Sequence, residues 1–163
     1  MGAGLLMRST IGFRINRLGV FVLAAQMMVG ISSAQTTTSA ERTVFQMVNR
    51  ERHAAGLPAL RWDDTLASAA RQHAGVMAAQ RSVAHVFPGE ASLPGRATQA
   101  GAHFSWLSEN VIESTDSVAA HAQFMASPTH RANILDSDMD TVGIGIVERS
   151  GRLYVVEDFE KAK

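Results

Sequence analysis

The sequence predicts an α+β fold in which helices cover both faces of a small antiparallel sheet. Near the C-terminus, two β-rich runs, "TVGIGIVE" (141–148) and "LYVVEDF" (153–159), flank "RSG", which is typical of a hairpin. Ahead of them, apolar residues recur at helical spacing in two long segments, and a third helical segment lies between the expected strands. Helices that precede the sheet and one that interrupts it favour α+β.

Two helices are expected at the start of the folded part. Ser39 can cap the first helix, which Gly56 ends. Asp63 or Asp64 can cap the second, in which apolar residues and one histidine share a face: Leu66, Ala69, Ala70, His73 and Met77. The many alanines of this second helix predict close packing against a broad surface such as a sheet.

The middle of the chain has weaker patterns. Residues 81–102 are rich in proline and glycine and predict a long connection, with one helical turn within 95–102. Residues 106–114 then predict a strand, and residues 116–127 a helix. Within the run 141–148, Gly143 and Gly145 leave one strand face bare, which lets another backbone, or a ligand, approach closely.

The N-terminal segment has the pattern of a signal peptide. Three arginines precede an apolar run (18–31), and the small residues Ser32 and Ala34 stand before Gln35. We therefore expect a signal peptide over 1–34, a polar linker over 35–42 and one domain over 43–160. An uncleaved N-terminal anchor is the alternative.

Export determines several further expectations. The protein should reach the periplasm or the cell exterior, with no membrane span after cleavage, and we expect a monomer. Without residues 1–34 the chain has 12 basic and 15 acidic side chains, so composition gives no electrostatic case for nucleic-acid binding. The chain has no cysteine, which excludes disulfides, thiol nucleophiles and cysteine-based metal sites.

Three of the six histidines have ordinary structural interpretations. His73 lies on the apolar face of the second helix, where a lone histidine is usually buried and hydrogen-bonded. His53 and His121 lie on polar or alanine-rich helix surfaces, and we expect both to be exposed to solvent.

His85, Glu109 and His130 are the candidate site residues. We expect each to lie at the end of an element or in a connection, where side chains converge on clefts. Two imidazoles and one carboxylate could form a tetrahedral metal site with an open position for water. They could equally form a hydrogen-bonded polar cluster without a metal, and spacing alone does not decide between these.

The motif order resembles one known family. "VNRERHAAGLPALRWDDTLASAARQHAGVMAAQ", His85, "SENV", "SPTHRANIL", "TVGIGIV" and "LYVVEDF" resemble, in the same order, the CAP superfamily of secreted SCP-like domains, specifically its cysteine-free bacterial branch. The resemblance covers about Thr43 to Phe159. It implies a three-layer α-β-α sandwich with a central cleft lined by His85, Glu109 and His130.

The chain departs from the family pattern at several positions: Ser108 and Thr129 replace glycines, Phe124 a tryptophan, Glu157 a glutamine, and Ser127 a second cleft glutamate. The resemblance implies a binding protein more than an enzyme, with a small molecule, a lipid, a cell-envelope component or a divalent metal such as Zn²⁺ as ligand. His85 and His130 are the candidate metal ligands.

A hydrolase is the alternative. Glu109 would then be the catalytic base beside a zinc ion on the two histidines, or Ser108 or Ser127 would be a nucleophile beside a histidine. A purely structural cell-envelope domain is a third possibility.

Overall fold

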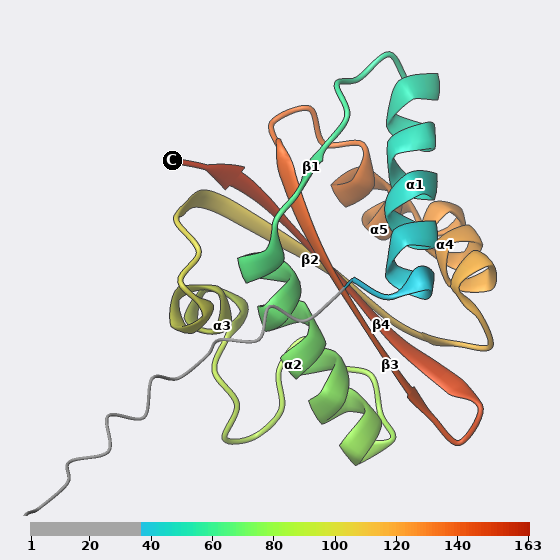
Figure 1. The fold of residues 1–163 in the computed structure, drawn as a ribbon, viewed down its shortest axis with the longest axis vertical. Coiled ribbons are helices and arrows are strands. Elements are labelled where there is room, and N and C mark those ends of the chain that lie inside the picture. The colour runs from blue at the N-terminus through green and yellow to red at the C-terminus, as the bar shows by residue number, and fades with distance from the viewer. Residues whose placement is uncertain (1–36) are drawn as a thin grey trace, which may run out of the picture. The chain divides into compact units, whose positions relative to one another are not determined.

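Four strands form one sheet in the order β1-β3-β4-β2 in the computed structural model, which describes residues 37–163 (Figure 1). The strands are β1 (Arg61–Trp62), β2 (Phe104–Ser114), β3 (Thr141–Arg149) and β4 (Arg152–Ala162). β3 and β4 form the predicted hairpin, and β2 pairs with β4, both antiparallel. The two-residue β1 joins β3 in parallel and was not predicted. The central sheet is therefore antiparallel except at this short edge.

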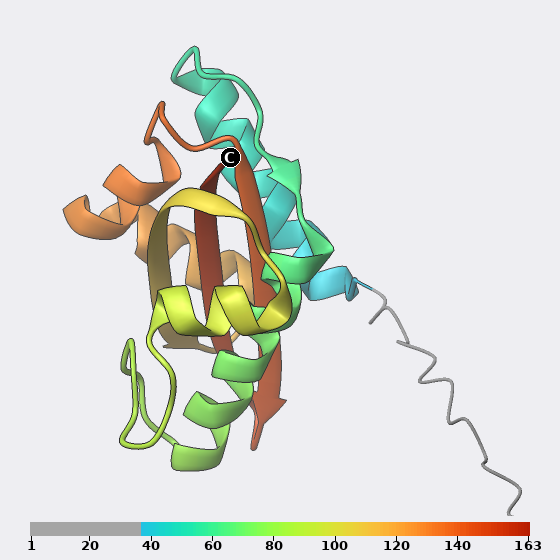
Figure 2. The same ribbon diagram turned by 90° about the vertical axis from the view of Figure 1, so that its left-hand side faces the viewer.

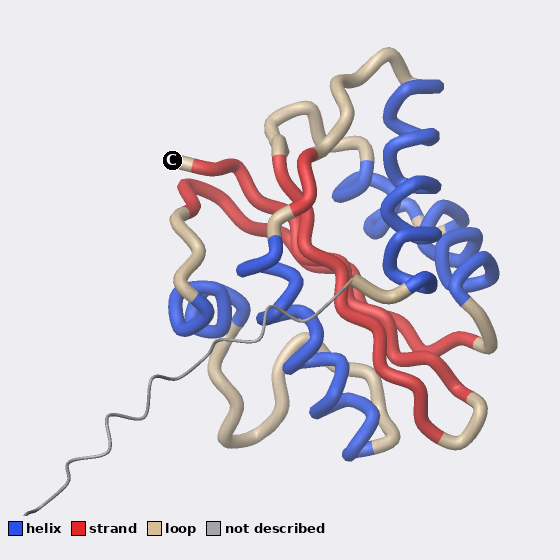
Figure 3. The backbone as a smooth tube through the Cα atoms, in the orientation of Figure 1, coloured by secondary structure: helices blue, strands red, loops and turns tan. Residues whose placement is uncertain are grey.

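Helices cover both faces of the sheet, as expected for the predicted α-β-α sandwich (Figures 2 and 3). They are α1 (Ser39–Ala54), α2 (Asp64–Gln80), α3 (Leu93–Ala100), α4 (Ser117–Ala126) and α5 (Pro128–Ile134). One apolar cluster joins α1, α4 and α5 to a face of β3 and β4, and a second joins α2 to β2 and β4. The three-layer prediction is confirmed.

Side chains at the N-cap positions determine where α1 and α2 begin. Thr38, one residue before the expected cap, forms a capping box with Glu41 at the start of α1. Asp63 caps α2 through a hydrogen bond from the backbone N–H of Leu66, as predicted. In the long connection, α3 is a complete helix of 8 residues where one turn was expected.

The predicted signal peptide lies outside the described residues, within which no helix is long and apolar enough to cross a membrane.

Gly143 and Gly145 bring α2 against β3. A Cβ built on Gly143 would lie 2.2 Å from the backbone N of Ala67, and one on Gly145 would lie 2.2 Å from the backbone C of Ala70. The helix therefore packs directly on the strand backbone. The bare strand face predicted from the alternating glycines accommodates this helix.

Arg52 ties α1 to a distant part of the chain. Its buried guanidinium donates to the backbone carbonyls of Pro58, Ile134, Asp136 and Met139, at 2.8 to 3.1 Å. These bonds satisfy carbonyls at the end of α5 and in the connection to β3. In a chain without cysteine, Arg52 thus supplies a long-range connection through hydrogen bonds.

Candidate functional site

The site lies on β2, the edge strand opposite β1 in the sheet order. Side chains alternate between the faces of a strand, so Glu109 and Asn110 point in opposite directions. Glu109 shares its face with Val111, which packs against α2. We call His85, Glu109 and His130 together the edge site.

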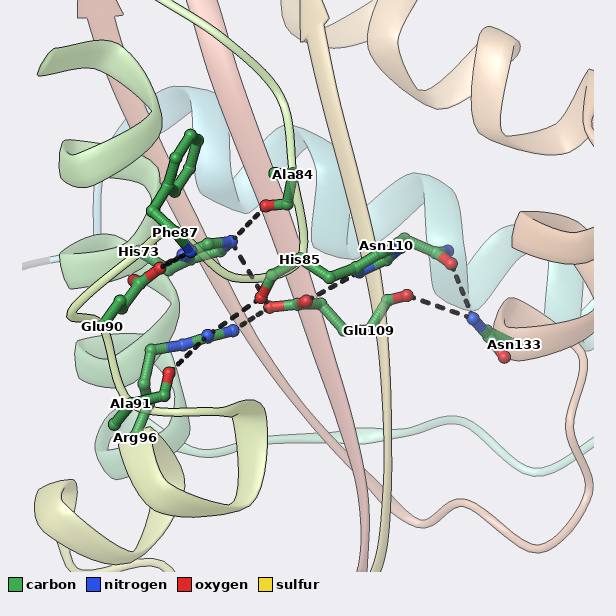
Figure 4. Close-up of polar contacts among 10 residues, drawn as sticks. All are labelled: His73, Ala84, His85, Phe87, Glu90, Ala91, Arg96, Glu109, Asn110 and Asn133. Carbon is green, nitrogen blue, oxygen red and sulfur yellow. Dashed lines mark hydrogen bonds and ion pairs between the residues drawn. The ribbon is translucent and has the colours of Figure 1, made fainter. Parts of the chain in front are cut away.

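The structure brings His85 and Glu109 into direct contact. His85 Nδ1 lies 2.8 Å from Glu109 Oε1 (Figure 4). The Glu109 side chain is 3% exposed, whereas that of His85 is 63% exposed. A buried carboxylate therefore orients an imidazole whose remaining nitrogen, Nε2, makes no hydrogen bond to the described residues.

Arg96 of α3 is the main partner that sequence reasoning missed. Its Nη2 donates to Glu109 Oε2, so the two carboxylate oxygens are held by different partners. Its Nη1 donates to the backbone carbonyls of His85 and Ala91, both at 3.1 Å. One buried guanidinium thus holds both the carboxylate of Glu109 and the loop that carries His85. The only sequence signal was that Arg96 is the one charged residue of the segment Leu93–Ala100.

His73 holds the same loop from α2. It is completely buried, and its ring nitrogens lie 2.7 Å from Glu90 Oε1 and 2.8 Å from the carbonyl of Ala84. Glu90 also accepts from the backbone N–H of Phe87. The interpretation of His73 as a hydrogen-bonded core residue is confirmed, and the residue positions the segment around His85.

His130 approaches from the opposite face of the sheet, on α5. Its backbone carbonyl accepts from Asn110 Nδ2 at 3.0 Å, and Asn133 Nδ2 donates to Asn110 Oδ1 at 2.8 Å. The ring packs edge-on against Phe124, and its Nδ1 is buried without a hydrogen-bond partner among the described residues. Burial lowers the pKa of His130, and the charge of His85 lowers it further. His130 therefore lies outside the direct contact that joins His85 to Glu109.

Two buried carboxyl groups of β4, Glu157 and Asp158, are the cross-strand neighbours of Asn110 and Glu109. Glu157 pairs with Asn110 across the strands and accepts a hydrogen bond from its Nδ2 at 2.9 Å. Burial raises the pKa of Glu157 to about 8, although this hydrogen bond opposes the shift. Asp158 is the cross-strand partner of Glu109, and the two carboxyl side chains share a hydrogen bond. Burial, followed by the charge of Glu109, raises the pKa of Asp158 well above its usual range.

Two other histidines, His53 and His121, lie away from the edge site. His53 is exposed, as expected. His121 was expected to be exposed, and that prediction is wrong, because α1 packs over α4 and leaves the residue 5% exposed. Burial lowers the pKa of His121, partly offset by Glu51, whose Oε1 lies 3.9 Å from the His121 Nε2.

A bound metal ion needs several donor side chains that point to one position. Within residues 37–163 no group of three or more histidine, aspartate or glutamate side chains is arranged to hold a metal ion. Glu109 is engaged by Arg96 and His85, so His85 and His130 are the donors that the edge site can offer. The Glu109–His85 contact matches the carboxylate–imidazole pairs that support metal-bound histidines. A metal held here would complete its coordination with water or with atoms of another ligand.

Comparisons with known proteins identify similar chains. Residues 45–159 match the model of the cysteine-rich secretory protein family, CAP. Two Bacillus subtilis proteins are similar: YkwD, at 31% identity over 76% of this chain and 48% of its own length, and the membrane protein YlbC, at 29% identity over 76% and 35%. This chain thus spans about a third to a half of the length of these two relatives.

Solved structures agree with the fold. An extracellular protein with an SCP domain from Bacillus anthracis superposes with a TM-score of 0.69 at 26% identity, over 75% of this chain and 40% of that one. An outer surface protein of Borrelia burgdorferi gives a TM-score of 0.72 at 20% identity, over 78% and 96%. The second likeness concerns the fold alone.

Proposed function

Because the chain belongs to the cysteine-rich secretory protein (CAP) family, we propose that it is an exported domain that binds a ligand at the edge site. Export is supported by the signal-peptide pattern over residues 1–34 and by the extracellular B. anthracis protein of similar structure. The observation that carries the binding proposal is the contact between the buried Glu109 carboxylate and the exposed His85 ring.

A divalent metal such as Zn²⁺ is the ligand that these side chains suit best. Glu109 fixes the orientation of His85, so the ring presents Nε2 with little loss of side-chain entropy on binding. The lowered pKa of His130 keeps its ring neutral to a lower pH than an unperturbed histidine, and a metal needs the neutral ring. His85 and His130 would hold the ion, and the metal would act there as a Lewis acid toward a further ligand.

The arrangement supports binding better than hydrolysis. A general base must reach a water molecule, yet the Glu109 side chain is only 3% exposed and each of its oxygens already contacts Arg96 or His85. The Ser108 hydroxyl is buried without a hydrogen-bond partner in the described part of the chain, and the Ser127 side chain makes no capping bond at α5. Neither candidate nucleophile is therefore preorganised beside a histidine.

Calorimetric titration with zinc chloride tests the proposal. The wild-type protein should bind one zinc ion, and affinity should fall as the pH drops through about 6.5, where unperturbed histidines become protonated. His85→Ala and His130→Ala should each remove most of the affinity, and Glu109→Gln should weaken it by roughly 10–100-fold. His53→Ala, which removes an exposed histidine on α1, is the matched control and should bind as the wild type does. Unchanged zinc binding in the His85→Ala, His130→Ala double variant would refute the metal proposal.

A further inference from the structure

A polar pocket separate from the edge site lies at the hairpin end of the molecule. It has a volume of about 230 Å³ and is lined by residues from the end of α2, from β2 and from the β3–β4 hairpin: Arg81, Glu113, Arg149, Ser150, Arg152 and Tyr154. Glu113 follows Glu109 by four residues on β2, so the pocket begins about 13 Å along the strand from the edge site. It shares no residue with the edge site.

Charge in this pocket is unbalanced. Three guanidinium groups face a single carboxylate, which leaves a net charge of +2 on the lining side chains. Arg149 and Arg152 are direct partners across the hairpin. Like charges in directly opposed positions destabilise an antiparallel pair. An anion bound between them would relieve that repulsion.

Two of the arginines are held in place by the fold. Arg152 Nε donates to Glu113 Oε1 at 2.8 Å. Arg149 Nη1 donates to the carbonyls of Ala78 and Ala79, at 3.0 and 3.2 Å, and so caps the end of α2. These contacts give each side chain a structural role but use only one nitrogen of each guanidinium. Their other N–H groups make no hydrogen bond to residues 37–163, so they can bind a ligand in a fixed geometry.

Arg81 has no such structural bond. It is the exposed C-cap of α2, with a left-handed backbone (φ 52°) at a position where glycine is usual. Its cation interacts favourably with the helix C-terminus, but that effect is small at an exposed position. Among the described residues its side chain has neither a hydrogen bond nor an ion pair. A third guanidinium at the pocket is thus left for a ligand.

The chemistry of the lining specifies the ligand. Guanidinium groups bind phosphate oxygens through two parallel N–H bonds, and the hydroxyls of Ser150 and Tyr154 add further donors. The volume is below the roughly 300–1,000 Å³ of pockets that enclose whole small molecules, so the pocket suits one compact group. A phosphate monoester carries about −1.5 to −2 charges at neutral pH, which matches the net charge of the lining. We propose that this pocket binds the phosphate group of a phosphomonoester.

Titration calorimetry at constant ionic strength tests this proposal, with inorganic phosphate, glucose 6-phosphate and dimethyl phosphate as probes. The first two should bind with one saturable site and comparable affinity, because the pocket contacts only the phosphate group. Dimethyl phosphate, with a single charge and two blocked oxygens, should bind more weakly. Equal binding of all three, or no saturable binding of the first two, would overturn the proposal.

Variants locate the site. Arg81→Gln should weaken phosphate binding about tenfold or more, because it removes a charge-assisted bond, and Arg152→Gln should do the same. Arg61→Gln is the matched control: this arginine side chain is 71% exposed on β1, which pairs with the opposite end of β3. His85→Ala should also leave phosphate binding unchanged, which separates this ligand from that of the edge site. An equal loss in Arg61→Gln would overturn the proposal, because phosphate would then respond only to overall charge.

Discussion

Replacing Glu157 by glutamine should stabilise the protein at alkaline pH. Glu157 is fully buried, and its pKa is raised from 4.5 to about 8 by burial. An acid whose pKa is higher in the folded state binds its proton more tightly there, so stability falls as pH rises from about 4.5 to about 8. The difference between a pKa of 4.5 and one of about 8 corresponds to roughly 5 kcal/mol of stability lost as the pH rises through this range.

The substitution removes this charge while retaining the acceptor for Asn110. The new amide NH₂ takes the place of Oε1, which has no partner among the described residues, and an unsatisfied buried donor costs roughly 1–3 kcal/mol. The expected net gain is therefore about 2–4 kcal/mol above pH 8, with little or no gain below pH 5.

Urea denaturation followed by tryptophan fluorescence at about pH 5, 7 and 9 measures this difference. The wild-type curve of unfolding free energy against pH should fall more steeply than that of Glu157→Gln. Some fall should remain in the variant, because the pKa of Asp158 is also raised by burial. Glu148→Gln, at an exposed position of β3, should run parallel to the wild type. Parallel curves for Glu157→Gln and the wild type would mean that Glu157 is not a buried, protonated acid.

Three further results are expected. Gly145→Ala should cost about 3 kcal/mol or more in unfolding free energy, because its Cβ would overlap the backbone of Ala70 in α2, whereas Gly75→Ala, with nothing within 4 Å of its Cβ, should not destabilise. Arg52→Lys should cost about 3 kcal/mol in urea denaturation, since an ammonium group cannot reach four carbonyls that the guanidinium fork satisfies. Intact mass of the exported protein should correspond to a chain that begins at Gln35, and recovery of the complete chain from membranes would favour an anchor instead.

Local patterns in the sequence predicted most of the fold. The hairpin was predictable because its turn and the β-branched residues of both strands are adjacent in sequence. The second helix was predictable from its aspartate cap and its apolar spacing. β1 could not be predicted in this way, since two residues carry no periodicity and only pairing with β3 makes them a strand. α3 was underestimated because its proline and glycine suggested a loop, although proline is favourable in a first helical turn.

Only part of the candidate site could be predicted from the sequence. Family motifs indicated His85 and Glu109, and their contact is direct in the structure. Arg96 belongs to no such motif, and its role depends on α3 packing beside β2. His121 was misjudged for a related reason: an alanine-rich helix gives no sign of which neighbour covers its polar residue. Burial by a partner element is a tertiary property that spacing within one helix does not encode.

The strand order has a consequence for how the chain folds. Both edge strands pair with strands that are made later: β1 needs β3, and β2 needs β4. The sheet can therefore close only after the last 23 residues, 141–163, are present, and its non-local pairings carry a loop-closure cost that slows folding. A chain that crosses a membrane from its N-terminus would remain extended until its hairpin arrives. For an exported chain, this topology would delay folding until the hairpin has crossed the membrane, and the hairpin would then act as the template on which both edges assemble.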